Sequence, residues 1–314
     1  MQNDIKAVVT GGAGFIGSHI TEELMQRGYH VIVIDDLSTG KMENIQHLLD
    51  EGNLNFVRGS ITNLALLQKF FSDADYIFHQ AAIPSVPRSI KNPLASNEVN
   101  VTGTLNVLSA ARDQGIKKVI FASSSSVYGD TPNLPKREDM TPNPQSPYAV
   151  TKLAAEYYCR VFTDVYGIST ICLRYFNVFG ARQNPDSQYA AVIPKFIKAI
   201  NEGKSPVIFG DGEQTRDFTF IKDVVHANIL AAESKAFGVF NIGKGDRISI
   251  NQLAQIILKL NGKENVKPLY ENGRLGDIKH SLADISKAQS FGYKPEYDVE
   301  KGIIETIRSF KYVT

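Results

Sequence analysis

A tyrosine and a lysine near the middle of the chain have the spacing of a proton-transfer pair. In the segment SPYAVTK, Tyr148 and Lys152 are four residues apart, so on a helix they project from one face. Free tyrosine has a pKa near ~10, and a nearby ammonium group favours the phenolate, which can act as a base. Ordinary amphipathic helices also contain such pairs. Whether Tyr148 and Lys152 transfer protons therefore depends on which other side chains lie close to them.

A run of serines supplies hydroxyl groups that could join this pair. Ser123–Ser126 follows the apolar segment KKVIFA, which is typical of a buried strand. In doubly wound folds, ligands bind at the carboxyl ends of such strands. A serine meeting Tyr148 and Lys152 at that edge would complete a proton-transfer group.

A glycine-rich turn near the start of the chain predicts a dinucleotide site. In the segment TGGAGFIGSH, which follows a strand-like run, Gly12, Gly14 and Gly17 have the G-x-G-x-x-G spacing. Glycines there let the backbone approach a pyrophosphate at the positive end of a helix. Asp35 closes the next strand, where a carboxylate binds the ribose of NAD and repels the extra phosphate of NADP. The alternative is a tight turn beside a surface aspartate. With both features in register, NAD is the predicted cofactor, and its positive nicotinamide ring would further favour the phenolate of Tyr148.

Strand-like and helix-like segments alternate through the first half of the chain, and their order predicts how these residues are positioned. Helical stretches separate most of the strands, notably residues 92–115. This rhythm indicates an α/β fold with a doubly wound parallel sheet and right-handed crossovers. The predicted strands are residues 5–10, 30–35, 55–59, 75–80, 117–123 and 170–175.

Beyond these strands the alternation gives way to loops rich in glycine, proline and asparagine. We expect a Rossmann NAD-binding domain in residues 1–175. We expect a smaller substrate-binding lobe in residues 176–314, with some of its segments returning to the sheet. Shorter helices are predicted near residues 190–202, 221–235, 249–260 and 298–310.

The composition argues against several other classes of protein. Of the 314 residues, 43% are hydrophobic and 21% are charged, as in a globular protein with a sizeable core. The formal net charge is +1 without a basic block, so nucleic acid is not an expected partner. Cys159 and Cys172 have neither disulfide nor metal-ligand spacing, and no metal is expected. No segment has the pattern of a signal peptide or a membrane span, so we expect a cytoplasmic protein.

Four motifs in this order give the chain a resemblance to a known family. VTGGAGFIGSH, SSSSVYG, YAVTK and LRYFNVFG are together similar to extended short-chain dehydrogenase/reductases that act on nucleotide sugars. The resemblance implies that Tyr148 is the base, that Lys152 holds the nicotinamide ribose and that Ser124 bonds the sugar hydroxyl. The implied NAD-binding residues are Gly11, Gly14, Phe15, Ile16, Asp35, Asp36, Ser38, Thr39, Gly40, Ser60, Ile61, Gln80, Ala81, Ala82, Ser123, Tyr148, Lys152 and Tyr175.

The end of the serine run indicates which reaction of this family to expect. In related 4,6-dehydratases the positions of Ser125 and Ser126 hold Asp and Glu, which eliminate water after oxidation at C4. The decarboxylating relatives keep Glu at the position of Ser126. Hydroxyl groups can hydrogen-bond a 4-keto intermediate but are poor acid–base catalysts near neutral pH. We therefore expect epimerisation: oxidation at C4, turning of the ketose and return of the hydride to its other face.

Within the 4-epimerases, the chain resembles the UDP-N-acetylglucosamine 4-epimerase group through NVFGARQNPDSQYAAVIPKF and GDIKHSLAD. The resemblance places Ser281 where strict UDP-galactose epimerases have tyrosine, and a small residue leaves room for an N-acetyl group. Pro84 at the sugar pocket and Ser60 near the adenine depart from the family pattern. The implied substrate-binding residues are Pro84, Ser124, Ser125, Ser126, Tyr148, Asn177, Gln183, Ala191, Val192, Arg216, Arg274, Asp277 and Ser281.

The resemblance further divides these substrate residues by role. Asn177, Arg216 and Arg274 are placed around the diphosphate, and Asp277 on the uridine ribose. Arginine suits such sites because its planar fork matches phosphate oxygens. From their positions, we interpret Arg88 and Arg182 as surface charges, and we interpret His79 and His280 as structural residues.

A homodimer and two alternative functions remain open from the sequence. The helix near residues 148–167 has more apolar residues than one packing face needs. With residues 92–115 it would form the two-fold interface of this family, and burial within the monomer is the rival account. One alternative function is UDP-glucuronate 4-epimerase, which needs a cation for the C6 carboxylate. The other is an inactive NAD-binding regulator, against which the intact Ser124, Tyr148 and Lys152 argue.

Overall fold

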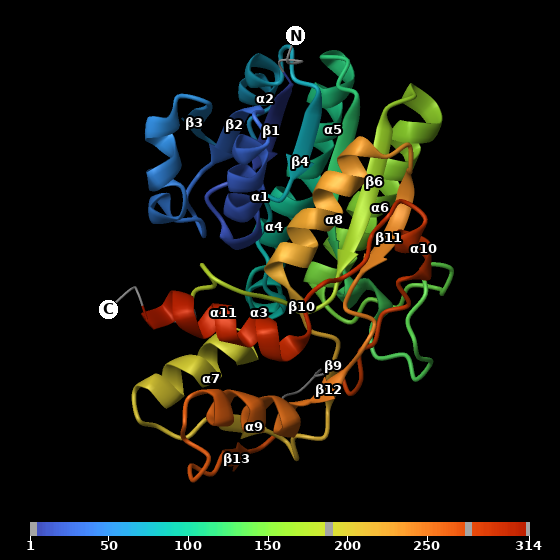
Figure 1. Ribbon diagram of the computed structural model, residues 1–314. Helices are drawn as coiled ribbons and strands as arrows, with labels where there is room; N and C mark the ends of the chain where they lie inside the picture. Colours follow the sequence, from blue (N-terminus) through green and yellow to red (C-terminus); the bar gives the residue numbers. More distant parts are fainter. Residues whose placement is uncertain (1–4, 186–190, 274–277, 312–314) are drawn as a thin grey trace.

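The computed structural model describes residues 5–185, 191–273 and 278–311, and a seven-stranded sheet forms its centre (Figure 1). The strand order is β11-β6-β5-β4-β1-β2-β3, and all neighbouring strands are parallel. The order reverses between β1 and β4, which is where doubly wound sheets bind ligands. The predicted fold class is therefore confirmed. The strands are β1 (Lys6–Thr10), β2 (His30–Asp35), β3 (Leu54–Arg58), β4 (Tyr76–His79), β5 (Lys118–Ser124), β6 (Ser169–Tyr175) and β11 (Gly238–Ile242).

The strand β11 comes from the second half of the chain and was not among the six predicted strands. It pairs with β6 along its whole length, from Gly238 opposite Ile171 to Ile242 opposite Tyr175. Its sequence, GVFNI, is short and lies between loops, so its own pattern is a weak signal. The pairing with β6 supplies the backbone hydrogen bonds that make it a strand.

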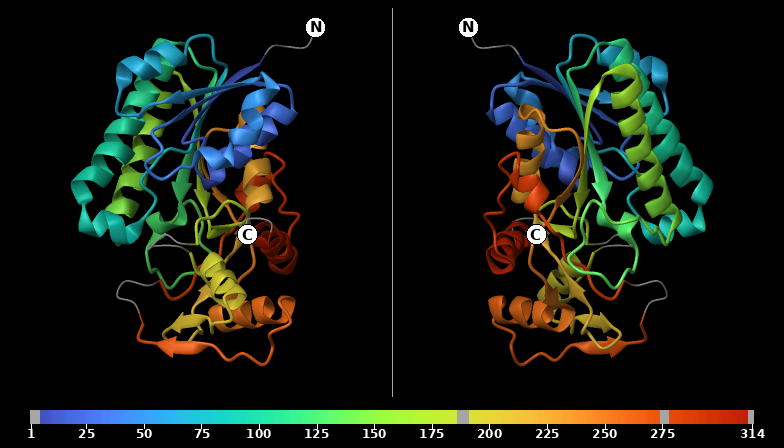
Figure 2. Two further views of the ribbon diagram at one scale, coloured as in Figure 1. Left: turned by 90° about the vertical axis from the view of Figure 1, so that its left-hand side faces the viewer. Right: turned by 90° about the vertical axis from the view of Figure 1, so that its right-hand side faces the viewer.

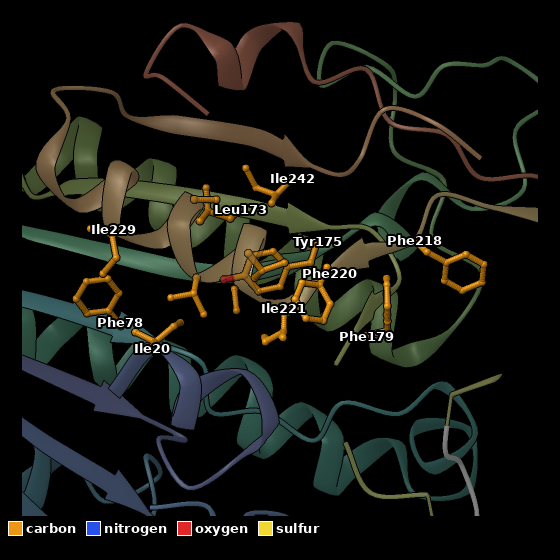
Figure 3. Close-up of a cluster of buried hydrophobic side chains, with 14 of the residues drawn as sticks. Ile20, Phe78, Leu173, Tyr175, Phe179, Phe218, Phe220, Ile221, Ile229 and Ile242 are labelled. Atoms are coloured by element: carbon orange, nitrogen blue, oxygen red, sulfur yellow. The ribbon is translucent and has the colours of Figure 1, made fainter. Parts of the chain in front are cut away.

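Helices cover both faces of the sheet (Figure 2). On one face lie α1 (Phe15–Gln26) and α8 (Ile221–Glu233), and on the other lie α2 (Leu64–Phe70), α5 (Gly103–Asp113) and α6 (Pro147–Tyr166). Successive residues of a strand point to opposite faces of the sheet. Val9 packs in the core beneath α1 and α8, and Val8 packs in the core beneath α2, α5 and α6. Figure 3 shows the first core, where Ile20 of α1 and Ile229 of α8 meet Phe78 and Leu173 of the sheet.

The helix predicted over residues 92–115 is interrupted. It consists of α4 (Pro93–Asn97), a π-helical turn η3 (Glu98–Thr102) and α5. Within the turn, the buried Asn100 accepts a hydrogen bond from the Ile83 N–H (2.8 Å) and donates one to Thr151 of α6 (3.1 Å). Such wide turns often occur beside functional sites. This one ties the end of β4 to α6.

A smaller group of elements lies beyond the carboxyl ends of the strands, at the bottom of Figure 1. The strands β9 and β12 pair antiparallel, and β8 and β13 pair parallel. The elements of this group are α7 (Val192–Asn201), β8 (Val207–Phe209), β9 (Thr215–Arg216), β12 (Ile248–Ser249), α9 (Ile250–Leu260), β13 (Leu269–Glu271) and α11 (Val299–Lys311). The remaining short elements are η1 (Met42–Asn44), η2 (Gln46–Glu51), α3 (Val86–Lys91), η4 (Ser125–Tyr128), β7 (Val178–Phe179), β10 (Thr219–Phe220) and α10 (Ser286–Gln289).

The described part of the chain contains neither a membrane-spanning helix nor a cluster of metal ligands. None of its helices combines the length and the apolar character that crossing a bilayer requires. Within the same residues, no three His, Cys, Asp or Glu side chains are grouped as metal ligands.

Candidate functional site

The start of α6 determines where the proposed base lies. Ser146 caps the helix by accepting a hydrogen bond from the Ala149 N–H (3.2 Å), and Pro147 is the first helical residue. Tyr148 and Lys152 therefore occupy the first two turns, beside the carboxyl end of β5. The Lys152 ammonium donates a hydrogen bond to the carbonyl of Ala122 on that strand (2.8 Å).

Burial shifts the protonation of both side chains toward their neutral forms. It raises the pKa of Tyr148 to about 12, against a hydrogen bond with Ser124 that favours the phenolate. Burial also lowers the pKa of Lys152 to about 8. The Lys152 ammonium lies 6.0 Å from the Tyr148 ring centroid and donates to a carbonyl instead. The expected lowering of the Tyr148 pKa by Lys152 is therefore not found in the protein alone.

A cavity of about 270 Å³ runs along the carboxyl ends of β1, β2 and β4. All predicted NAD-binding residues line it except Gly40. Gly40 lies behind the cavity wall, where a Cβ atom would come within 2.8 Å of Asp35 Oδ2, so its role is to leave room for that carboxylate. Lining residues that the sequence did not assign to the cofactor are Gly17, Ile34, Gly59, Pro84, Val99 and Ala122.

The backbone around this cavity fits a dinucleotide. A Cβ atom at Gly11 would lie 2.7 Å from the Ala81 Cα, and one at Gly17 would lie 2.1 Å from the Gly11 carbonyl oxygen. Only glycine permits this close approach of β1, α1 and β4. No side chain caps the N-terminus of α1, so its first N–H groups are available to an anion at the cavity.

Asp35 is held in place at the end of β2. Its carboxylate accepts hydrogen bonds from the N–H groups of Ala13 (3.0 Å) and Leu37 (2.8 Å), each to a different oxygen. Leu37 adopts a left-handed conformation (φ 61°), which directs its N–H toward Asp35. Burial raises the pKa of Asp35, and the two N–H groups oppose that shift. Each oxygen keeps a lone pair for a ribose hydroxyl, since a carboxylate oxygen accepts two hydrogen bonds.

A second cavity, of about 680 Å³, adjoins the first and contains the serine run. Val192 is not among its lining residues: as the first residue of α7 it packs against the hydrophobic core, and its substrate contact stays a prediction. Arg274 and Asp277 lie outside the described residues. The predicted substrate-binding residues that line the cavity are Pro84, Ser124, Ser125, Ser126, Tyr148, Asn177, Gln183, Ala191, Arg216 and Ser281.

Three further residues also line this cavity, and the sequence had been interpreted to give two of them other places, Arg88 as a surface charge and His280 as a structural residue. The three are Arg88 in α3, Lys136 in the loop after η4, and His280 beside Ser281. The Lys136 ammonium donates to the carbonyl of Thr131, and burial lowers the pKa of Lys136. His280 bonds Thr215 through Nδ1 (2.9 Å). Lys136 and His280 lie in irregular segments and Arg88 in the short helix α3, so only their tertiary position reveals them.

The buried carboxylate of Asp217 joins the segments that wall this cavity. It accepts hydrogen bonds from the N–H groups of Lys244 (2.8 Å), Gly245 (3.1 Å) and Ala283 (3.0 Å). Its own carbonyl accepts a hydrogen bond from the Asn177 side chain (2.9 Å). One side chain thus joins the strand of Arg216, the end of β11 and the segment of Ser281. The sequence analysis did not single it out.

Comparisons with known proteins agree with this geometry. Residues 7–243 match the model of the NAD dependent epimerase/dehydratase family. A UDP-glucose 4-epimerase of Mycolicibacterium smegmatis is 37% identical over 313 residues, which cover 98% of this chain and 99% of that protein. The chain belongs to the NAD-dependent epimerase/dehydratase family. The sequence-based expectations of this family and of NAD as cofactor are therefore confirmed.

Solved structures are similar over nearly the whole chain. The UDP-N-acetylglucosamine 4-epimerase of Methanobrevibacter ruminantium M1, in complex with UDP-N-acetylmuramic acid, superposes with a TM-score of 0.96 at 46% identity, covering 99% of both chains. The UDP-glucuronic acid 4-epimerase of Bacillus cereus, in complex with UDP-glucuronic acid and NAD, gives a TM-score of 0.91 at 36% identity. It covers 99% of this chain and 100% of that one. Bound NAD supplies a hydride acceptor and a positive charge, so this chain's own residues have to bind the sugar and take up its proton.

We predict that Tyr148→Phe keeps the fold and NAD but loses most activity. The change removes the hydroxyl that would accept the sugar's proton, and loss of a general base commonly costs ~10²–10⁴-fold in rate. The measurements are turnover, melting temperature and the NAD content of the purified protein. Tyr158→Phe on the exposed side of the same helix is the control and should change none of them. A near wild-type rate for Tyr148→Phe would show that the base is elsewhere.

Proposed function

We propose that this UDP-sugar 4-epimerase interconverts UDP-N-acetylglucosamine and UDP-N-acetylgalactosamine and also accepts UDP-glucose and UDP-galactose. The observation that carries the proposal is a pair of unpaired polar atoms on two residues that line the larger cavity. Ser126 Oγ and Gln183 Oε1 are buried and have no hydrogen-bond partner among the described residues. Buried polar atoms are rarely left without partners unless a ligand supplies them.

An acetamido group has the chemistry that these atoms need. Its N–H can donate to the Gln183 carbonyl oxygen, and its carbonyl can accept from a serine hydroxyl. Gln183 is held in place because its amide donates to the carbonyl of Val178 (3.0 Å). Ser281 is small and lies in the same wall, where its N–H donates to the Thr215 carbonyl (3.0 Å). These features leave room for a group larger than a hydroxyl.

The lining of the larger cavity also supports epimerisation rather than elimination. Its described lining residues include hydroxyl and amide groups but no Asp or Glu. Tyr148 would accept the proton of the C4 hydroxyl while Ser124 holds that oxygen, since the interaction with Ser124 already favours the phenolate of Tyr148. Because the described lining has no carboxylate to place beside C5 and C6, no residue of that lining would remove a proton from C5. The 4-ketose would then be reduced on its other face.

An acidic sugar is the second candidate substrate. Arg88 and Lys136 place two cationic side chains in the same wall, and UDP-glucuronate needs such a group for its C6 carboxylate. The similar structure from Bacillus cereus contains UDP-glucuronic acid. The similar structure from Methanobrevibacter ruminantium M1 contains UDP-N-acetylmuramic acid, which carries both an acetamido group and a carboxylate.

A homodimer through α6 is part of the proposal. Val150, Tyr157, Val161 and Val165 expose 47–66% of their surface along this helix. Ile90 of α3 and Leu94 of α4 extend the same apolar patch, because both helices contact α6. On α5, by contrast, no large apolar side chain is exposed among those described, so the 92–115 segment contributes through α4. A continuous apolar patch of this kind marks an interaction surface.

We predict that the purified protein converts UDP-N-acetylglucosamine into its C4 epimer only. Because the sugar cavity contains hydroxyl groups where eliminating relatives have acids, neither a 4-keto-6-deoxy sugar nor carbon dioxide should form. A panel with UDP-glucose and UDP-glucuronate, separated by chromatography, compares the candidates. Turnover of UDP-glucuronate alone would replace the proposal by the acidic-sugar function, and a deoxy sugar would exclude epimerisation as the main reaction.

We predict that Ser281→Tyr sharply lowers kcat/KM for UDP-N-acetylglucosamine while sparing UDP-glucose. A tyrosine in this wall would overlap the acetamido group in at least one of the two sugar orientations. Exclusion from a packed pocket costs ~1–3 kcal/mol, or roughly a ten- to hundredfold change in selectivity. Ser281→Ala keeps the small size and should leave the ratio unchanged. An equal loss for both sugars with Ser281→Tyr would contradict the gatekeeper role.

We predict that Val161→Glu converts a dimer into a monomer. A carboxylate in the apolar patch on α6 would be buried without a partner in the two-fold interface. Sedimentation or light scattering measures the mass. Leu269→Glu is the control, because Leu269 is similarly exposed (57% against 47%) but lies on β13 in the smaller group of elements. A wild-type protein that sediments as a monomer would refute the dimer.

A further inference from the structure

Three side-chain contacts, one per helical turn, join α6 to the end of β5. Tyr148, Lys152 and Glu156 follow one another at intervals of four residues, so they share one face of the helix. Tyr148 interacts with the Ser124 hydroxyl, which favours the phenolate, and Lys152 donates to the carbonyl of Ala122 (2.8 Å). The third bond runs from the Ser123 hydroxyl to Glu156 Oε1 and is short (2.5 Å). The first two belong to the proposed chemistry, and the third has no part in it.

Glu156 is a buried carboxylate that the reaction does not use. Its side chain is 3% exposed and pairs with Arg174, whose side chain is 4% exposed. The guanidinium donates through Nε (2.8 Å) and Nη2 (2.7 Å), one bond to each carboxylate oxygen. Burying such a pair adds little to stability compared with apolar side chains. Its forked geometry, however, fixes the plane of the carboxylate. Oε1 therefore stays directed at Ser123.

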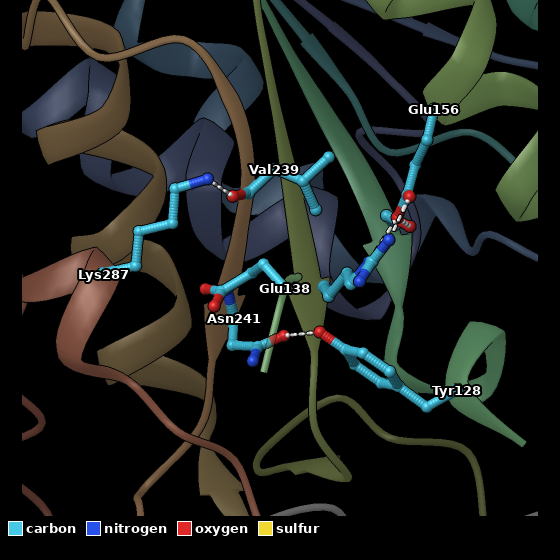
Figure 4. Close-up of polar contacts among 8 residues, drawn as sticks. Tyr128, Glu138, Glu156, Val239, Asn241 and Lys287 are labelled. Carbon is cyan, nitrogen blue, oxygen red and sulfur yellow. Dashed lines mark hydrogen bonds and ion pairs between the residues drawn. The ribbon is translucent and has the colours of Figure 1, made fainter. Parts of the chain in front are cut away.

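The pair also reaches the wall of the sugar cavity. The Arg174 guanidinium stacks on the ring of Tyr128 (4.6 Å to the centroid), and the Tyr128 hydroxyl donates to Asn241 Oδ1 (2.7 Å). Asn241 donates in turn to the carbonyls of Lys136 (2.9 Å) and Asp284 (3.1 Å). Figure 4 shows Glu156 on one side of this network and Tyr128 with Asn241 on the other. The orientation of Glu156 is thus set by contacts on both sides of β6.

We propose that Ser123 is a positioning residue for the epimerisation. Its hydroxyl, held by Glu156 and Arg174, fixes the strand end so that Ser124 stays within hydrogen-bond reach of Tyr148. The sequence analysis assigned Ser123 to NAD binding. In the structure its hydroxyl instead donates a hydrogen bond to Glu156, although the residue also lines both cavities. The inference rests on the proposed 4-epimerase function and concerns the same site.

The test is the variant Ser123→Ala, which deletes one hydroxyl and leaves the Glu156–Arg174 pair intact. A misplacement of about 1 Å at a reacting group can cost ~10²-fold in rate, so kcat should fall roughly ten- to hundredfold. KM for the UDP-sugar and the NAD content should stay within about twofold, and Ser123→Thr should restore part of kcat because it returns the hydroxyl. Glu156→Gln is a poorer variant because it leaves the buried Arg174 charge uncompensated.

The matched control is Thr170→Val, which breaks a hydroxyl contact between the same helix and the next strand. Thr170 Oγ1 donates to the Cys159 carbonyl (2.9 Å) and bonds Thr163 of α6 (2.8 Å), toward the opposite end of the helix from Tyr148. We expect Thr170→Val to lower the melting temperature about as much as Ser123→Ala does, without lowering kcat. An equal loss of kcat in Thr170→Val would reduce the role of Ser123 to general stability. Loss of NAD from Ser123→Ala, with normal turnover per bound NAD, would make Ser123 a cofactor contact. A kcat within twofold of wild type would also overturn the proposal.

A second measurement does not depend on activity. Hydrogen exchange of the amides in residues 147–156 should become faster in Ser123→Ala and stay unchanged in Thr170→Val. Unchanged exchange in both variants would overturn the positioning role even if the enzyme is active. A wild-type protein that turns over no UDP-sugar would instead refute the proposed function, and the exchange data would still decide whether Ser123 holds the helix.

Discussion

The attachment of α6 to the carboxyl end of β5 is the constraint on which the site depends. A base on a helix and a hydroxyl on a strand can act on one oxygen only if their distance is fixed. The structure fixes it from two directions: the cap at Ser146 sets where α6 begins, and Lys152 anchors the second turn to a strand carbonyl. Neither contact involves a flexible loop. Sites built on helices and strands hold their geometry more accurately than sites built on loops.

The same burial that fixes this geometry works against the chemistry. It raises the pKa of Tyr148 and lowers that of Lys152, so it disfavours the charged form of each group in the protein alone. The Ser124 hydrogen bond offsets part of the penalty. Among the described residues no Lys or Arg side chain lowers the pKa of Tyr148, so the positive charge of bound NAD would supply a further lowering. The base would then ionise readily only when the cofactor is in place.

The sequence predicts the sheet and the cofactor site well because both have local signals. Each of the first six strands has its own apolar run, and the glycine spacing of the first turn is itself a sequence signal, with Gly17 required by contact with the Gly11 carbonyl. What the sequence misses is decided by tertiary contacts. The strand β11 depends on β6, and the π-helical turn depends on what Asn100 bonds. Lys136 enters the sugar cavity because its backbone bonds the Ser281 segment at Leu282 (2.8 Å).

Substrate choice is consequently the least predictable property of this site. The serine run sits on a strand end that the sheet fixes, whereas the opposite wall consists of loops around Gln183 and Ser281. These segments are joined through one residue, since the Asp217 carboxylate accepts from the Ala283 N–H near Ser281 and its backbone carbonyl accepts from the Asn177 side chain. A substitution in a loop can therefore change the wall without disturbing Tyr148 or Ser124. This separation would allow the sugar to change while Tyr148 and Ser124 keep their positions. Specificity must accordingly be argued from the residues in the wall, and two of these, Ser126 and Gln183, carry buried oxygens that have no hydrogen-bond partner among the described residues.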